Sequence, residues 1–286
     1  MPADYHMHLE RDEVTGPCRY TPERIAEYVE AARRRGVGEI GVSEHCHRFA
    51  EFAHVMEDLW RPEPVAGAFW LPGQFNHRLE QYVEAVLAAR RRGLPVKLGI
   101  EVDYLPGREE ELRRLLAPYP WDYVIGSVHF LDGWAIDVGP EYGWPRVDVD
   151  EAYRAYFARL RQAALSGLFD VLAHPDLIKK FGHRPSFDLA GEYEETAAAL
   201  AAAGVAAEVS TAGWRKPVGE AYPHPDLLRV LQRRGVPICF GSDAHDPDEV
   251  ALDFPRAVRL ARSCGYTRWV RWEGRRPALV DLTSAY

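Results

Sequence analysis

Short apolar runs alternate with amphipathic helical patterns along almost the whole of this 286-residue chain. In TPERIAEYVEAARRRG, Thr21 is a predicted N-cap, Pro22 takes the first helical position, and apolar residues recur at helical spacing up to Gly36. Such an alternation is typical of βαβ units in a parallel sheet. We predict strands near 3–8, 39–44, 96–102, 123–129, 170–174, 206–210 and 237–243, and helices near 21–36, 75–92, 108–117, 149–166, 186–203, 224–234 and 248–263.

Seven units without a low-complexity linker favour one α/β domain over residues 1–286, closed into a barrel. Two segments depart from a plain barrel. Residues 46–74 form an aromatic-rich insertion, of a length typical of a lid or a substrate-shaping loop. The tail RWVRWEGRRPALVDL predicts a closing β-hairpin.

Composition narrows the classes of function. The net charge is −8 and basic runs are short, which argues against a nucleic-acid partner. The sequence shows neither a signal peptide nor an apolar segment of membrane-spanning length, and the four cysteines form no C-x-x-C motif. We therefore expect a cytoplasmic protein that does not bind membranes. The sequence leaves its oligomeric state open.

Histidines and carboxylates gather at the carboxyl ends of the predicted strands. In a parallel barrel these ends meet at one face, where active sites lie. A single histidine there is more often structural, but several from separate strands favour a site for zinc, iron or manganese. His6 and His8 can address one ion, because residues i and i+2 of a strand share a face. The candidate ligands are His6, His8, His45, Glu101, His129, His174, Asp243 and His245, with Glu44 at the same ends.

The order of these motifs resembles that of the polymerase and histidinol phosphatase superfamily, and within it the monofunctional histidinol-phosphate phosphatases. The matching segments are HMH, SEH, GIEVDY, GSVH, AHPDLIKKFG, EVSTAGWRKP and GSDAH, spread over nearly the whole chain. The resemblance implies a distorted seven-stranded (β/α) TIM-like barrel with two or three divalent metal ions (Zn, Fe or Mn). It implies one ion among His6, His8, Glu101 and Asp243, a second bridged by Glu101 and completed by His129 and His174, and a third at His45 and His245.

One segment departs from that pattern. Many relatives carry a further histidine just past a cysteine after the first motif, whereas this chain reads GPCRYTP, with Arg19 or Tyr20 at that place. The ligand set of the third ion is therefore open, and Glu13 or a water are the substitutes that we considered.

The resemblance also implies a small-molecule phosphate monoester as substrate. We expect hydrolysis of L-histidinol phosphate to L-histidinol and phosphate in histidine biosynthesis, through a hydroxide that bridges two ions. The leaving alkoxide would take its proton from Asp243 or His245. Arg215 and Lys180 would bind phosphate, and Glu44 would accept a hydrogen bond from the ammonium or imidazole of the substrate.

Three other functions compete with this interpretation. A general phosphoesterase or an exonuclease of the same superfamily would keep the site and change the substrate. An amidohydrolase-type barrel usually carries a bridging lysine on its fourth strand, where this chain reads GSVH. A metal-binding sensor would hold ions without hydrolysing esters. The remaining histidines (His47, His54, His77, His183 and His224) lack a partner motif, and we expect most of them at the surface.

Overall fold

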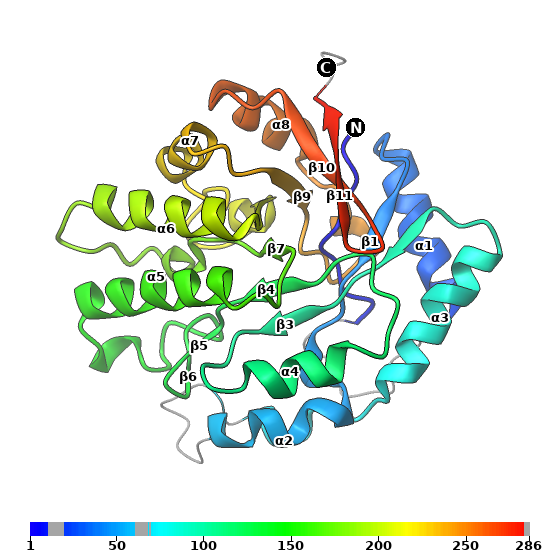
Figure 1. Ribbon diagram of the computed structural model, residues 1–286, viewed down its shortest axis with the longest axis horizontal. Helices are drawn as coiled ribbons and strands as arrows, with labels where there is room; N and C mark the ends of the chain where they lie inside the picture. The colour runs from blue at the N-terminus through cyan, green and yellow to red at the C-terminus, as the bar shows by residue number, and fades with distance from the viewer. Residues whose placement is uncertain (11–19, 61–67, 69, 283–286) are drawn as a thin grey trace.

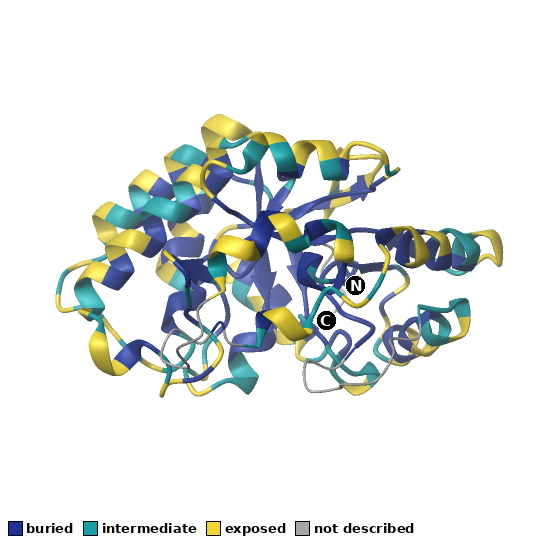
Figure 2. Cartoon of the chain, turned by 90° about the horizontal axis from the view of Figure 1, so that it is seen from below, coloured by how far each residue is buried: buried dark blue, intermediate teal, exposed yellow. Residues whose placement is uncertain are grey.

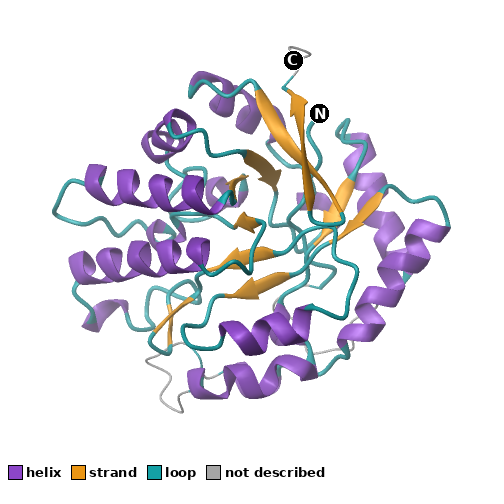
Figure 3. Ribbon diagram, in the orientation of Figure 1, coloured by secondary structure: helices purple, strands orange, loops and turns teal. Residues whose placement is uncertain are grey.

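The computed structural model describes residues 1–10, 20–60, 68 and 70–282. Its short strands lie at the centre and its helices at the periphery (Figure 1; Figure 3). The helices are α1 (Pro22–Arg34), α2 (Ala53–Met56), α3 (Leu79–Arg91), α4 (Glu109–Leu116), α5 (Val149–Leu165), α6 (Ala190–Ala203), α7 (Pro225–Arg233) and α8 (Phe254–Ser263).

Five parallel strands form the larger sheet, in the order β3-β4-β7-β8-β9, and β1 and β2 form a parallel pair. The strands are β1 (Ile40–Val42), β2 (Val96–Leu98), β3 (Glu101–Asp103), β4 (Ile125–Ser127), β7 (Val171–Leu172), β8 (Ala206–Ser210) and β9 (Ile238–Gly241). A small antiparallel hairpin, β5 (Phe130–Leu131) and β6 (Trp134–Ala135), was not predicted. The predicted terminal hairpin is confirmed as β10 (Arg268–Glu273) and β11 (Arg276–Asp281).

The N-terminal segment joins the two ends of the sheet. Asp4 pairs with Ile40 of β1, and Met7 pairs with Ala244 just after β9, both in parallel. His45, just after β1, pairs with Glu101 of β3 and so links the smaller pair to the larger sheet. Within the described residues the strands therefore follow one another round a closed ring, which is the expected TIM-like barrel. The first strand is less regular than predicted, with isolated bridges in place of a continuous ladder.

The predicted helices are present, although three of them begin later than their patterns suggest. Helix α3 begins at Leu79 rather than near residue 75, because Phe75 has a positive φ and His77 bridges to Phe49. Helix α8 begins at Phe254, because Ala251 and Asp253 also have positive φ values. Helix α6 begins at Ala190. Helix α1 matches its prediction, with Thr21 accepting a hydrogen bond from Arg24 N at 3.1 Å.

The core lies between the strands and the inner faces of the helices. Buried residues cover the strands and the inward sides of the helices, and exposed residues follow the outer sides (Figure 2). Inside the ring, the hydroxyl of Tyr123 donates to the carbonyl of Tyr5 at 2.7 Å. Gly41 and Gly99 leave room for the aromatic side chain of Tyr123, because a Cβ added at either glycine would lie 2.2–2.3 Å from an atom of that side chain. No helix in the described part of the chain has the length and apolarity needed to cross a membrane.

Candidate metal centre

The carboxylate of Glu101, at the start of β3, lies between two groups of histidines. Its Oε2 atom lies 3.4 Å from Nε2 of His6 and 3.6 Å from Nε2 of His8. The same oxygen lies 2.6 Å from Nδ1 of His45. Three histidines from two strand ends therefore face one oxygen of a carboxylate that is 1% exposed.

The other oxygen of Glu101 faces the second group. Its Oε1 atom lies 3.3 Å from Nε2 of His174 and 3.6 Å from Nε2 of His129. His129 lies just after β4 and His174 just after β7, so neighbouring strands supply both rings. Glu101 thus has one oxygen toward each group, which is the arrangement that a carboxylate needs to bridge two cations.

Asp243 follows β9 and faces two ring nitrogens of the first group. Its Oδ1 atom lies 3.3 Å from Nε2 of His8 and 3.6 Å from Nε2 of His6. Asp243 has a φ of +52°, and its backbone N–H donates to the carbonyl of His6 at 2.7 Å. The closed ring of strands therefore brings the first and last parts of the predicted ligand set together.

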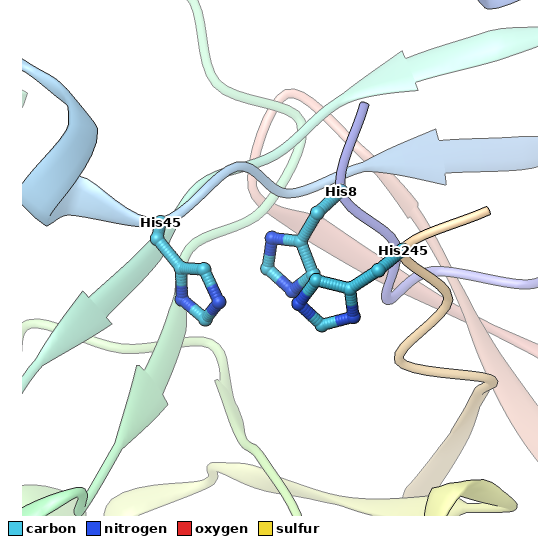
Figure 4. A group of neighbouring side chains, drawn as sticks. All are labelled: His8, His45 and His245. Carbon is cyan, nitrogen blue, oxygen red and sulfur yellow. The ribbon is translucent and has the colours of Figure 1, made fainter. Parts of the chain in front are cut away.

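A further group consists of His8, His45 and His245. One ring nitrogen of each lies within 4.8 Å of the others. His8 stacks on His45 with ring centroids 3.9 Å apart, and its centroid lies 4.5 Å from that of His245. Figure 4 shows the three rings, which come from three separate segments of the chain, turned toward a common space. The predicted third pair, His45 and His245, thus meets His8, which also belongs to the first group.

The electrostatics of these groups suit cations. Burial by itself would lower the pKa of His8, but Asp243 and Glu44 raise it to about 9. Burial would raise the pKa of Glu101, yet the histidines His45 and His6 hold it well below its usual range. These buried carboxylates therefore stabilise positive charge on or among the rings. Divalent ions can take the place of the protons, because neutral imidazole and carboxylate are ligands for transition metals.

The ring nitrogens that would donate to a metal ion are also available. Within the described structure, Nε2 of His6 and Nε2 of His8 are buried without a hydrogen-bond partner of good geometry. A buried polar atom without a hydrogen-bond partner lowers the stability of the fold unless a bound ligand satisfies it. Both atoms face Glu101 and Asp243. The residues present therefore fit a bound metal ion.

Buried carboxylates orient the rings from behind. Oδ1 of Asp103 lies 2.8 Å from Nδ1 of His129, on the side away from Glu101. Oε1 of Glu44 lies 3.4 Å from Nδ1 of His8, and its other oxygen accepts from Leu9 N at 3.1 Å. Carboxylates in such places fix the orientation and tautomer of metal-binding histidines. Asp103 follows Glu101 by two residues on the same strand. This spacing places both side chains on one face of the strand, so the sequence contained a signal for the position of Asp103.

A cavity of about 510 Å³ opens beside the histidine groups. His45 and His129 line it on the side of the metal centre, and Trp70 and Gln74 line it from the predicted insertion. Asp137, Phe130 and Val138 border it near the β5–β6 hairpin. The insertion therefore contributes to the wall of the cavity.

Three cationic side chains line this cavity: Arg48, Lys180 and Lys216. Nζ of Lys180 donates to the carbonyl of Asp137 at 2.7 Å and to its carboxylate at 3.1 Å. Lys180, which the sequence analysis predicted to bind phosphate, therefore lies on the cavity wall. Lys216 and Arg48 also line the cavity.

The other two predicted substrate contacts lie outside the cavity lining. Arg215 donates through Nη2 to the carbonyl of Ser242 at 2.8 Å, behind Asp243, and its Nε lies 3.3 Å from Glu249. Glu44 is fully buried beneath His8. Both residues therefore contact parts of the centre in this arrangement, and their contacts with substrate stay predictions.

The sequence analysis missed His47. Surface placement was expected, but the side chain is 7% exposed, stacks on His45 at 4.6 Å and lines the cavity. Its spacing of two residues from His45 was the available signal. His54 follows the expectation, with 60% of its side chain exposed.

The segment that departs from the family pattern can be followed only in part. Tyr20 packs edge-on against His77 and Tyr82, with ring centroids 5.2 Å and 5.4 Å apart. It therefore lies in an aromatic cluster. Arg19 and Glu13 fall outside the described residues.

Comparison with known sequences places these residues in a family. Residues 4–212 match the PHP domain. The chain is 37% identical over 274 residues to a protein of Deinococcus radiodurans named probable histidinol-phosphatase, with 92% of this chain and 94% of that protein covered. It is 24% identical to the histidinol-phosphatase of Bacillus subtilis, with 81% and 91% covered.

Solved structures show the same fold. Histidinol phosphate phosphatase from Lactococcus lactis, complexed with zinc, L-histidinol and phosphate, superposes with a TM-score of 0.72 at 22% identity, covering 97% of this chain and 98% of that one. The putative histidinol phosphatase of Listeria monocytogenes gives 0.71 at 23% identity, covering 89% and 99%. The closed ring of strands, the histidine groups around Glu101 and the extent of the match lead to one conclusion: this chain belongs to the PHP-domain family.

Proposed function

We propose that this protein is a metal-dependent phosphomonoesterase that hydrolyses L-histidinol phosphate to L-histidinol and phosphate. The observation that carries the proposal is the position of Glu101, with one oxygen toward His6, His8 and His45 and the other toward His129 and His174. The sequence similarity, along 92% of this chain, to the Deinococcus protein named probable histidinol-phosphatase supports the choice of substrate.

The ligand set suits two or three divalent ions. His6, His8, Asp243 and Glu101 would hold one, and Glu101, His129 and His174 a second; His45 and His245, with His8, would hold a third. When bound, such ions polarise phosphoryl oxygens and lower the pKa of water toward neutrality. Zinc is the ion in the Lactococcus complex, and the same donors also accept iron or manganese.

The chain's own residues would bind and orient the ester. Lys180 and Lys216 line the cavity and would neutralise the charge of the phosphate. Asp137 lies on the same part of the wall, because its carboxylate is 3.1 Å from Nζ of Lys180, and it would hold Lys180 in place. Burial would raise the pKa of Asp137, but Lys180 and His129 lower it, so its carboxylate is charged at neutral pH. Asp243 or His245, at the mouth of the ring, would deliver the proton to the leaving alkoxide.

A comparison of substrates tests the proposal. The purified protein is analysed for bound metals, and phosphate release is then measured on L-histidinol phosphate, on an aryl phosphate and on an oligonucleotide. We expect kcat/KM for histidinol phosphate to exceed the other two by at least about 100-fold, because the cavity offers both cations and a carboxylate. Similar values on all three would favour a general phosphoesterase, and preference for the oligonucleotide would favour an exonuclease.

The Glu101→Gln variant shows whether the activity belongs to this site. A neutral amide cannot bridge two cations as a carboxylate does, so metal content and phosphate release should fall together. Glu39→Gln is the matched control, because Glu39 is a partly buried glutamate that contacts Tyr5 and Arg271 and none of the candidate ligands. Full activity in Glu101→Gln would refute the bridging role.

A further inference from the structure

Glu208 is a buried carboxylate in the middle of β8, between Ala207 and Val209. Its side chain is 1% exposed. Taking a charged carboxylate out of water is costly unless strong hydrogen bonds or opposite charge compensate. In the sequence this residue begins the segment EVSTAGWRKP, and no role was predicted for it.

The two oxygens of Glu208 contact different parts of the metal centre. Oε1 lies 2.9 Å from Nδ1 of His6, and Oε2 accepts from the backbone N–H of His174 at 2.7 Å. His6 belongs to the group on one side of Glu101 and His174 to the group on the other. One buried side chain therefore supports both halves of the centre.

Each contact has a clear physical effect. The ring of His6 turns Nδ1 toward Glu208 and Nε2 toward Glu101 and Asp243, so a proton held on Nδ1 leaves Nε2 as the ligand atom. His174 has a φ of +26°, a value that residues other than glycine rarely adopt. The hydrogen bond from its N–H to Glu208 holds the peptide in that conformation.

The neighbouring strand leaves room for this arrangement. A Cβ added at Gly241 of β9 would lie 1.9 Å from Oε1 of Glu208 and 2.5 Å from Cβ of His6. A larger residue at position 241 would therefore push Glu208 and His6 apart. On the far side of Glu101, Asp103 and His129 repeat the pattern, with a carboxylate at Nδ1 and Nε2 toward Glu101.

We infer that Glu208 is a positioning residue that fixes the tautomer of His6 and the backbone of His174, and thereby sets the affinity of the centre for divalent metal. Carboxylate partners of metal-binding histidines typically contribute about 10- to 100-fold to affinity. The inference rests on the proposed function in one respect, namely that the histidine groups bind metal. It requires no particular substrate.

Glu208→Gln is the test, because the amide has nearly the shape of the carboxylate. Its carbonyl can still accept from His174 N–H, but its NH₂ group then faces Nδ1 of His6. His6 must accept that hydrogen bond, which moves its proton to Nε2, the atom that faces the metal. We expect zinc affinity, measured by competition with a chelator in the absence of substrate, to fall by about 10- to 100-fold. Glu39→Gln should leave zinc affinity unchanged.

A double-mutant cycle with His6→Ala separates this role from a general loss of structure. If Glu208→Gln acts through the ring of His6, it should change zinc affinity by less than about 3-fold once that ring is gone. An equal loss with and without His6 would overturn the inference, as would wild-type zinc affinity in the single variant. If the zinc results are as expected but zinc-loaded wild-type protein releases no phosphate from L-histidinol phosphate, the proposed function alone is refuted.

A further check observes the tautomer of His6 directly in the wild-type protein. In zinc-loaded protein with 15N-labelled histidine, the NMR signals of His6 should show a proton on Nδ1 and none on Nε2. Assignment of the signals uses the missing resonance in His6→Ala. A proton on Nε2 of His6 would overturn the inference.

Discussion

At the scale of single residues, the site is built from histidines whose two ring nitrogens face different carboxylates. His129 lies between Asp103 and Glu101, and His6 between Glu208 and Glu101. Each ring is held from behind by one carboxylate and turned toward another. Such pairs fix the ring geometry before any ion binds, so less ordering remains to be done on binding.

The identity of the residue that protonates the leaving group can be tested by comparing two substrates with different leaving groups. Histidinol leaves as a poor alkoxide and needs a proton, whereas nitrophenolate leaves without one. Of Asp243→Asn and His245→Gln, we expect one variant to lose roughly 10²-fold more activity on histidinol phosphate than on nitrophenyl phosphate. Loss of metal alone would lower both activities by the same factor. Equal losses on the two substrates in both variants would mean that neither residue supplies the proton.

At the scale of elements, the terminal hairpin is fastened to the barrel through Glu39, which precedes β1. Its carboxylate accepts from the hydroxyl of Tyr5 at 2.6 Å and from Nε of Arg271 in β10 at 3.1 Å. Trp269 and Trp272 of β10 are buried beneath the hairpin, and the residues of β11 are mostly exposed. The hairpin therefore covers the barrel with one strand and faces solvent with the other.

Glu39→Gln should show the contribution of this carboxylate to stability. Burial would raise the pKa of Glu39, but Arg271 and Tyr5 lower it below its usual value. A lowered pKa in the folded state means that the stabilisation is present above the pKa of the unfolded chain and is lost as pH falls through the folded value. We expect the variant to be less stable by about 1.5–3 kcal/mol at pH 7. In urea titrations the difference should shrink as the pH is lowered below about 4.

At the scale of the whole molecule, function depends on closure of the ring. Asp4 accepts from Ser242 N at 2.9 Å and from Ala251 N at 2.8 Å, so the first residues hold the loop that carries Asp243 and His245. Met7 bridges to Ala244 in the same loop. The first and last ligands of the sequence meet because these contacts close the barrel.

Packing inside the ring can be tested at Gly99, whose added Cβ would lie 2.3 Å from Cζ of Tyr123. Gly99→Ala should destabilise the protein by about 1–3 kcal/mol, because an extra methyl group in a filled core forces its neighbours apart. Gly38→Ala is the matched control, since nothing lies within 4 Å of its added Cβ. Equal thermal midpoints for the two variants would contradict this account of the barrel interior.

The sequence by itself determined the order of the elements and predicted most of the side chains that gather at the candidate centre. Hydrophobic periodicity and strand-end position depend on local spacing, so the sequence predicts that His129 after β4 and His174 after β7 belong to the centre. The terminal hairpin followed from its alternating pattern in the same way. These features are local, and the sequence records them directly.

Only the tertiary structure decided which residues stand behind the ligands and which face the cavity. Glu208 of β8 reaches His6 past Gly241 of the intervening strand β9, and Asp103 of β3 meets His129 just after the neighbouring strand β4. Arg215, which follows β8, donates to the carbonyl of Ser242. His47, expected at the surface, lines the cavity and packs against Trp70, with ring centroids 4.9 Å apart. Such contacts join residues far apart in the chain, and their geometry is set by closure of the barrel, which no local pattern encodes.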